Sequence, residues 1–189
     1  MNIKDKFLYF MGNWRCFKFP FHLVYGAQSY KLTKRYGVCI PRLEQFICPG
    51  DIIFRRYDDY SSTFFIGLGT GGFWTHTGIC IGDGKVIHAL KDGVIIEDIR
   101  NFCNCDHVAL KRYNYTEERI EKIVAKAKGM VGRPYDFNFD TKTQDKLYCS
   151  ELIYALLGKG ELPNDGGMIS PQEVFDDNES YLVFDSRNE

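Results

Sequence analysis

The stretch from residue 76 to residue 97 constrains the fold most, because it alternates short apolar runs with tight turns. The segments "HTGICI" and "KVIHAL" flank Gly82-Asp83-Gly84, and "KDG" then separates the second segment from "VIIE". Glycine and aspartate in these places are typical of short hairpin turns. We therefore predict consecutive antiparallel strands over residues 77–81, 85–89 and 94–97.

Further elements are expected on both sides of these hairpins. Strands are predicted over 51–55 and 107–113. Three helices should follow: one capped by Thr116, one that begins near Cys149, and one that begins at "SPQE", where Ser170 is the cap. Strands followed by helices within one chain predict an α+β fold.

The chain is expected to consist of one domain with an N-terminal extension. Its 189 residues contain no linker rich in Pro, Gly or Ser, so we predict a main domain over 48–189 and a basic, aromatic extension over 1–47 that packs on it. Residues 1–35 carry seven Lys or Arg against one acid, with aromatic residues between them. This pattern leaves open a peripheral contact with an anionic membrane through residues 1–35. No nucleic-acid-binding motif is present.

The cysteine count and the lack of export features indicate the compartment. No apolar run approaches the roughly 20 residues that span a bilayer, and the N-terminus does not resemble a secretory signal. Seven cysteines, an odd number, then indicate reduced thiols. We expect a cytoplasmic protein, with a membrane-peripheral location left open, and one thiol available as a nucleophile. No P-loop or dinucleotide motif is present, so no cofactor is predicted.

Three residues are candidates for one site. His76 and His88 lie at the two ends of the first predicted hairpin, where the turn brings them near each other, although the turn register decides whether they share a face. Cys149 lies at the start of a helix, where free amide groups and the helix dipole favour an anion. We therefore predict a lowered pKa for the Cys149 thiol, lowered further by a neighbouring His76 imidazolium.

Four segments together carry a family resemblance. "PGDIIF", "HTGICIGDGKVIHA", "GRPYDFNF" and "YCSELIYALL" resemble the NlpC-type papain-like cysteine hydrolases over roughly residues 48–175. Because the "YCS" helix follows the histidine strands, the order resembles the circularly permuted branch, the YiiX/YaeF-like proteins and the lecithin retinol acyltransferase-like enzymes. The resemblance implies an antiparallel sheet or partial barrel packed against helices, with the nucleophile at a helix N-terminus.

The resemblance also implies roles for the three candidates. Cys149 would be the nucleophile, His76 the general base, and His88 the polar residue that orients His76. Glu97, on the following strand, is the weaker candidate for the orienting role.

Two tyrosines are tentative substrate or oxyanion contacts on the same resemblance. Tyr135 lies in the segment that lines the cleft in the family, and Tyr148 precedes the nucleophile. For Tyr135, a buried aromatic residue with a purely structural role is an equally good interpretation.

The function predicted from these observations is a cysteine-dependent hydrolase of amidase or peptidase type, which acts through a thioester on Cys149. Two alternatives stay open: a thiol acyltransferase or esterase acting on lipids, and a non-catalytic domain that binds lipid or peptide. The substrate is expected to be a small peptide or a lipid amide or ester, and the oligomeric state is not indicated. A metal site at "CNCDH" (Cys103, Cys105, His107) is disfavoured because its spacing matches no common zinc pattern, so no metal is predicted.

Overall fold

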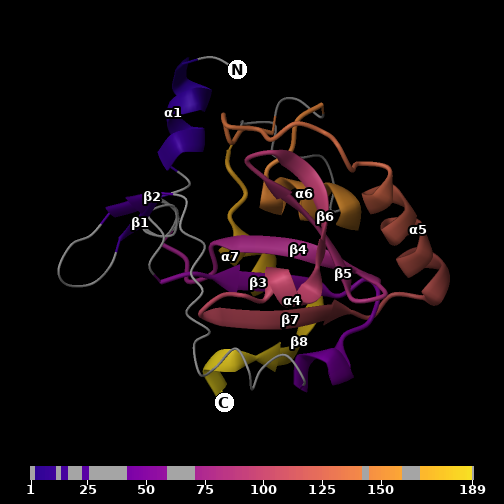
Figure 1. Ribbon diagram of the computed structural model, residues 1–189. Coiled ribbons are helices and arrows are strands. Elements are labelled where there is room, and N and C mark those ends of the chain that lie inside the picture. The colour runs from indigo at the N-terminus through magenta and orange to yellow at the C-terminus, as the bar shows by residue number, and fades with distance from the viewer. Residues whose placement is uncertain are drawn as a thin grey trace.

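The computed structural model describes residues 3–11, 14–16, 23–25, 42–58, 71–141, 145–158 and 167–188 (Figure 1). Most of the extension predicted over 1–47 therefore lies outside the described residues. The described residues include the central sheet, the helices that cover it and all of the candidate site residues.

Six antiparallel strands form the central sheet (Figure 1). In spatial order they are β6 (Gly93–Asp98), β5 (Lys85–Leu90), β4 (His76–Gly82), β3 (Ile52–Arg56), β7 (His107–Tyr113) and β8 (Ser180–Asp185). The sheet is open, with β6 and β8 at its edges. All five strands expected from the sequence are confirmed to within one or two residues, and β8 was not predicted.

The helices confirm the α+β class. They are α4 (Ile99–Phe102), α5 (Glu117–Lys128), α6 (Cys149–Leu157) and α7 (Pro171–Asp176), and a short 3-10 helix, η1 (Ser186–Asn188), follows β8. The predicted caps are present: the Thr116 side chain accepts from the backbone N–H of Arg119, and Ser170 accepts from that of Glu173. Gly158 ends α6 with φ 66°, a left-handed conformation that glycine adopts without strain.

The sheet separates two apolar cores. On one face, Ile52 of β3 and Ile79 of β4 pack with side chains of α5, α6 and α7. On the other face, Ile53 of β3 and Cys80 of β4 pack with Phe102 of α4. Successive residues of one strand therefore point to opposite cores, so the parity of a residue number in β3 or β4 decides which core its side chain meets.

The described part of the N-terminal extension consists of α1 (Ile3–Met11), a two-stranded sheet of β1 (Trp14–Cys16) and β2 (Leu23–Tyr25), and residues 42–47, of which Leu43 is fully buried in the core that contains Phe102. The strands pair antiparallel. In Figure 1, α1 lies at the top of the molecule, at the indigo end of the chain.

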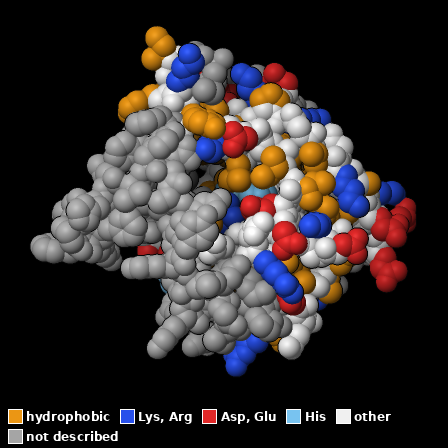
Figure 2. Space-filling view, viewed as in Figure 1, with side chains coloured by type: hydrophobic (Ala, Val, Ile, Leu, Met, Phe, Trp, Pro, Cys, Tyr) orange, Lys and Arg blue, Asp and Glu red, His pale blue; other side chains and the backbone are white. Residues whose placement is uncertain are grey.

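Helix α1 touches the main domain through a polar contact and leaves apolar side chains in water. The Tyr9 hydroxyl donates to Asp92 in the turn between β5 and β6, at 3.2 Å, and the Lys91 ammonium lies 4.3 Å from the centre of the Tyr9 ring. Ile3 and Phe7 are 87% and 61% exposed, and Figure 2 shows hydrophobic and basic side chains side by side at this end of the surface. Among the described helices, none is both long enough and apolar enough to cross a membrane.

Candidate active site

The two hairpin histidines lie on the same face of the sheet and touch. In the β4–β5 register, Ile79 is opposite Ile87, which places His88 opposite Gly78 and His76 two residues further along the same face. The His76 Nε2 and His88 Nδ1 atoms are 2.8 Å apart, and the ring planes meet at 77°. The predicted pairing is therefore confirmed as a direct contact.

A β-bulge decides that the histidines share a face. Gly82 pairs with Lys85, but Cys80 pairs with Val86, so one extra residue of β4 is accommodated between these two pairs. Without that extra residue, His88 would lie opposite Ile79 and point to the other core, away from His76.

Gly78 makes the close approach of the two strands possible. A Cβ atom at this position would lie 2.8 Å from Val86 Cγ1 and 3.1 Å from His88 Cβ. Both distances are shorter than an ordinary van der Waals contact, so any side chain here would displace His88. Sequence reasoning missed this residue, although a glycine inside a strand is a known sign of close backbone approach.

Glu97 extends the contact to the next strand. Val86 pairs with Glu97, so the Glu97 side chain lies on the same face as His88. Its Oε2 atom is 3.2 Å from His88 Nε2, in a poorly aligned contact that is more electrostatic than a linear hydrogen bond. His88 and Glu97 were weighed as alternative partners of His76; the structure arranges them in series, with His88 in contact with His76 and Glu97 in contact with His88.

Arg55 completes a row of four polar side chains. It is opposite His76 in the β3–β4 register and is only 6% exposed. Its Nη1 atom lies 3.5 Å from Glu97 Oε2 and donates to the Phe102 carbonyl at 3.1 Å, and its guanidinium carbon is 4.3 Å from the centre of the Phe102 ring. We call Arg55, His76, His88 and Glu97 the polar row; it crosses β3, β4, β5 and β6 under Phe102.

The surroundings keep both imidazoles of the polar row neutral. Burial lowers the pKa of His76 well below its usual value, and the charges of Arg55 and His88 lower it further. Burial also lowers the pKa of His88 to about 4, although Glu97 acts in the opposite direction. Burial acts to raise the pKa of Glu97, but its contacts with His88 and Arg55 outweigh burial and leave that pKa lowered. At neutral pH the row therefore contains one guanidinium, two neutral rings and one carboxylate.

Cys149 is the first residue of α6, and its thiol lies beside the residue that follows His76. Helix α6 packs against β4 and β5, and the thiol interacts with the Thr77 backbone and with the backbone of the first turn of α6. Among the described residues, no hydrogen bond joins this sulfur to either histidine ring. The structure thus brings Cys149 to the same end of β4 as His76. Helix α6 packs on the face of the sheet that Ile79 lines, whereas the histidine pair lies on the opposite face against Phe102, so the thiol meets the backbone of β4 and not the imidazole rings.

The predicted lowering of the Cys149 pKa is wrong. Burial raises the pKa of this thiol, and the backbone contacts from Thr77, Ser150 and Cys149 itself reduce that rise without reversing it. The helix N-terminus was correctly expected to favour the thiolate. The side chain is only 6% exposed, however, and the loss of water around the anion costs more than the amide groups return.

The segment that contains Tyr135 is held next to the residues that precede the nucleophile. The Leu147 N–H donates to the Pro134 carbonyl at 3.0 Å, and the Asp136 N–H donates to the Leu147 carbonyl at 3.3 Å. Burial raises the pKa of Tyr135 well above its usual value, and the nearby charge of Cys149 adds to this. Tyr135 therefore lies near Cys149, and its tentative assignment as a substrate or oxyanion contact stays a prediction.

Tyr148 has a structural contact. It occupies the N-cap position of α6, is 1% exposed, and its hydroxyl accepts from the Ile169 N–H at 2.8 Å. This bond ties the start of α6 to the segment that leads into α7. The tentative assignment of Tyr148 as a substrate or oxyanion contact stays a prediction.

Glu151 is a buried acid that sequence reasoning missed. Its Oε2 atom accepts from the Tyr148 N–H at 3.3 Å, which caps α6, and its Oε1 atom is buried without a hydrogen-bond partner. Burial raises the pKa of Glu151 to about 8, and Asp136 and Asp140 act in the same direction. A glutamate three residues after a helix cap was the available signal, because it is the second half of a capping box.

The "CNCDH" segment packs in the apolar core that contains Ile53 and Phe102. Cys103 and Cys105 are buried, and the Cys105 thiol donates to the carbonyls of Cys103 and His107 at 3.4 and 3.2 Å. The His107 Nε2 atom lies 3.2 Å from an Asp58 carboxylate oxygen. Within the described ranges, no group of three or more His, Cys, Asp or Glu side chains is arranged to hold a metal ion.

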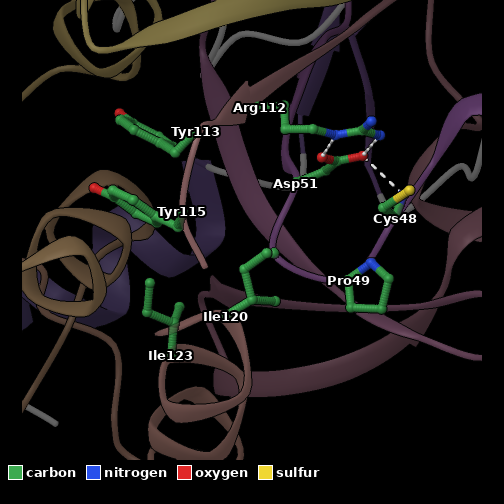
Figure 3. Close-up of a pocket in the computed structure, with 9 residues that line it drawn as sticks. Cys48, Pro49, Asp51, Arg112, Tyr113, Tyr115, Ile120 and Ile123 are labelled. Carbon is green, nitrogen blue, oxygen red and sulfur yellow. Dashed lines mark hydrogen bonds and ion pairs between the residues drawn. The ribbon is translucent and has the colours of Figure 1, made fainter. Parts of the chain in front are cut away.

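A pocket of about 200 Å³ lies elsewhere, between the start of β3 and α5 (Figure 3). At one end, Asp51 accepts from Arg112 Nε at 2.6 Å and Nη2 at 2.8 Å, and from the Cys48 N–H at 2.8 Å. The other end is lined by Tyr113, Tyr115, Ile120 and Ile123. The charged pair at this pocket is therefore satisfied internally.

Comparisons with known proteins show the family and the fold of the chain. A family model described as "Permuted papain-like amidase enzyme, YaeF/YiiX, C92 family" matches residues 47–184. The crystal structure of metalloprotein YiiX from Escherichia coli O157:H7 superposes with a TM-score of 0.63 at 22% sequence identity, covering 74% of this chain and 97% of that chain. No curated protein matches the chain. The structural likeness at this identity concerns the fold alone, and the family model confirms the predicted papain-like, permuted architecture.

Proposed function

The chain belongs to the permuted papain-like amidase family, and on that premise we propose that it is a hydrolase which cleaves an amide bond through a thioester on Cys149. The observation that carries the proposal is the 2.8 Å contact between His76 and His88 at the end of β4 where the Cys149 thiol meets the Thr77 backbone. A nucleophile, a base and a group that orients the base are the three parts that thiol catalysis requires.

The polar row supports an assignment of the protons. Glu97 accepts only, so the N–H of His88 belongs on Nε2, the atom that faces Glu97 at 3.2 Å. His88 Nδ1 then carries a lone pair and accepts from His76 Nε2–H at 2.8 Å. The remaining nitrogen of His76, Nδ1, carries a lone pair, which serves as the base in the proposed reaction. The row therefore sets His76 in the tautomer that a general base needs.

The reaction begins from a neutral thiol and a neutral imidazole. As the Cys149 sulfur attacks the carbonyl carbon, its proton passes to His76 Nδ1, and the carbonyl oxygen becomes an oxyanion held by backbone N–H groups at the start of α6. The C–N bond then breaks, and His76 returns the proton to the leaving amine. Water attacks the resulting thioester, His76 takes a proton from it, and the carboxylic acid leaves as the Cys149 thiol is restored.

A lipid amide or ester is the second substrate class that an observation favours. Ile3 and Phe7 are one helical turn apart on α1 and are exposed, with Lys4 and Lys6 beside them. Such a surface suits an anionic membrane. Transfer of the acyl group to an acceptor other than water would use the same thioester.

The decisive experiment is to trap the thioester. The protein is incubated with short-chain acyl 4-nitroanilides and 4-nitrophenyl esters, and each cysteine is examined by mass spectrometry for an added acyl group. We expect the acyl group on Cys149, loss of product in Cys149→Ala, and a rate on the order of a hundredfold lower in His76→Ala. Cys48→Ala is the matched control, because this thiol is exposed and lies at the other pocket. Product formation that survives Cys149→Ala would refute the proposal, and acylation of no cysteine by any probe would favour the binding-domain alternative.

A further inference from the structure

Arg55 is a buried cation that the mechanism above does not use. It is 6% exposed, and its Nε atom is buried without a hydrogen-bond partner. The contacts of Nη1 with the Phe102 carbonyl and with Glu97 leave the guanidinium only partly satisfied. Burying an arginine in this state is costly, so its position beside the histidine pair needs a reason.

The groups that face His76 come from every element packed around it. They are Arg55 from β3 and His88 from β5, with Glu97 of β6 behind His88 and the uncharged Phe102 ring from α4. The Cys149 thiol lies at the backbone of the next residue of β4, Thr77. Glu97 is the one carboxylate in the polar row, and its Oε2 atom is shared between Arg55 and His88. The negative charge that would otherwise support an imidazolium is therefore already matched by the guanidinium.

Resting on the hydrolase function above, we propose that Arg55 is a positioning residue that keeps His76 and His88 neutral and so keeps Cys149 a thiol until substrate binds. A fixed positive charge on the neighbouring strand opposes a second positive charge on either ring. The cysteine is therefore not at rest as half of a thiolate–imidazolium pair. Deprotonation is instead coupled to attack on the substrate, when the oxyanion adds a negative charge at the site.

The lowered pKa values of both rings and the raised pKa of Cys149 agree with this arrangement. The geometry makes a further distinction that burial alone does not: burial disfavours every ion at the site, whereas Arg55 lies opposite His76 on the neighbouring strand and acts against an imidazolium there. Removal of its charge, with the shape kept, should therefore act on the imidazoles and on the thiol through them.

The test is the pH profile of alkylation of Cys149 by iodoacetamide, read by mass spectrometry in the full-length protein. Arg55→Gln keeps a hydrogen-bond donor without the charge, and we expect the midpoint of the profile to fall by about one pH unit or more, with alkylation at pH 6 about tenfold faster. Arg55→Lys keeps the charge and should restore the wild-type midpoint. Arg56→Gln is the matched control, since this neighbouring arginine bonds Phe73 and Asp58 instead of the polar row.

If Arg55 had a purely structural role, Arg55→Gln would slow alkylation or unfold the protein without moving the midpoint of the pH profile. An unchanged midpoint in folded Arg55→Gln overturns the inference. The acylation assay separates this failure from failure of the proposed function: if His76→Ala slows thioester formation and Arg55→Gln leaves the alkylation midpoint unchanged, only the role of Arg55 is refuted. If His76→Ala leaves thioester formation unchanged, the dyad and the inference fall together.

A measurement on the wild-type protein covers the case in which Arg55→Gln does not fold. Imidazole chemical shifts from NMR report the charge of each histidine as pH is lowered. We expect the signals of His76 and His88 to keep neutral-ring shifts at pH 6. An imidazolium signal from either ring at that pH overturns the inference.

Discussion

Replacement of His88 by glutamine should remove a large part of the acid sensitivity of the fold. The pKa of His88 is lowered from 6.5 to about 4 because the ring is fully buried. Between these two values the unfolded chain binds a proton that the folded chain does not, so stability rises with pH through this window and is lost as pH falls. The contribution of His88 is fully present above pH 6.5.

The magnitude follows from the same two values. A shift of about 2.5 pH units corresponds to about 3 kcal/mol in full, of which about 2 kcal/mol falls between pH 7.5 and pH 5. The wild-type protein should therefore lose about 2 kcal/mol more than His88→Gln over this interval. At pH 5 most exposed carboxylates are still ionised, so they affect both proteins equally.

The assay is denaturant unfolding at pH 7.5 and pH 5, followed by far-ultraviolet circular dichroism. The difference between the two free energies of unfolding is taken for each protein, with the m-value checked for constancy. Equal differences in wild type and His88→Gln would refute the reasoning, because the folded protein would then accommodate a protonated His88 without penalty.

Four further outcomes are expected. Gly78→Ala should lower stability by about 1–3 kcal/mol and reduce thioester formation, because the new methyl group meets His88 Cβ; unfolding and acylation assays on the same sample test this. Glu151→Gln should lessen the loss of stability as pH rises from 4.5 towards 8, because the pKa of about 8 makes folded Glu151 hold a proton that the unfolded chain releases. The free energies of unfolding of both proteins at pH 5 and pH 8 test this. Tyr135→Phe should slow acylation while leaving stability unchanged if its hydroxyl contacts the substrate, and an unaltered rate would leave this residue a structural role. Ile3→Ser combined with Phe7→Ser should weaken sedimentation with anionic vesicles and leave hydrolysis of soluble probes intact; equal sedimentation would contradict the membrane contact.

Local sequence signals predicted most of the described fold. The turns at Gly82-Asp83-Gly84 and before Val94 and the caps at Thr116 and Ser170 each depend on a few neighbouring residues, so the elements they delimit were placed within one or two residues. The last strand, β8, depends instead on pairing with β7 across a long stretch of chain. No local pattern required it.

The candidate site was predictable as a set of residues but not as an arrangement. Whether His76 and His88 share a face depended on one extra residue near Gly82, a bulge that the hairpin pattern does not reveal. The place of Glu97 behind His88 depended on the register of a third strand. Shifting either register by one residue would have sent a site residue into the opposite core.

The charge state of the site was the part that sequence reasoning misjudged, and the reason lies in burial. A cysteine at a helix start looks activated because the dipole is a local property, whereas the depth of Cys149 and the presence of Arg55 one strand from His76 are tertiary properties. The consequence bears on how thiol labelling is interpreted. Slow alkylation of Cys149 in the free protein is what a neutral thiol and a neutral imidazole require, so it does not argue against catalysis. The thioester, which forms only when a carbonyl carbon accepts the sulfur as His76 accepts the proton, is the species that distinguishes an enzyme from a binding domain.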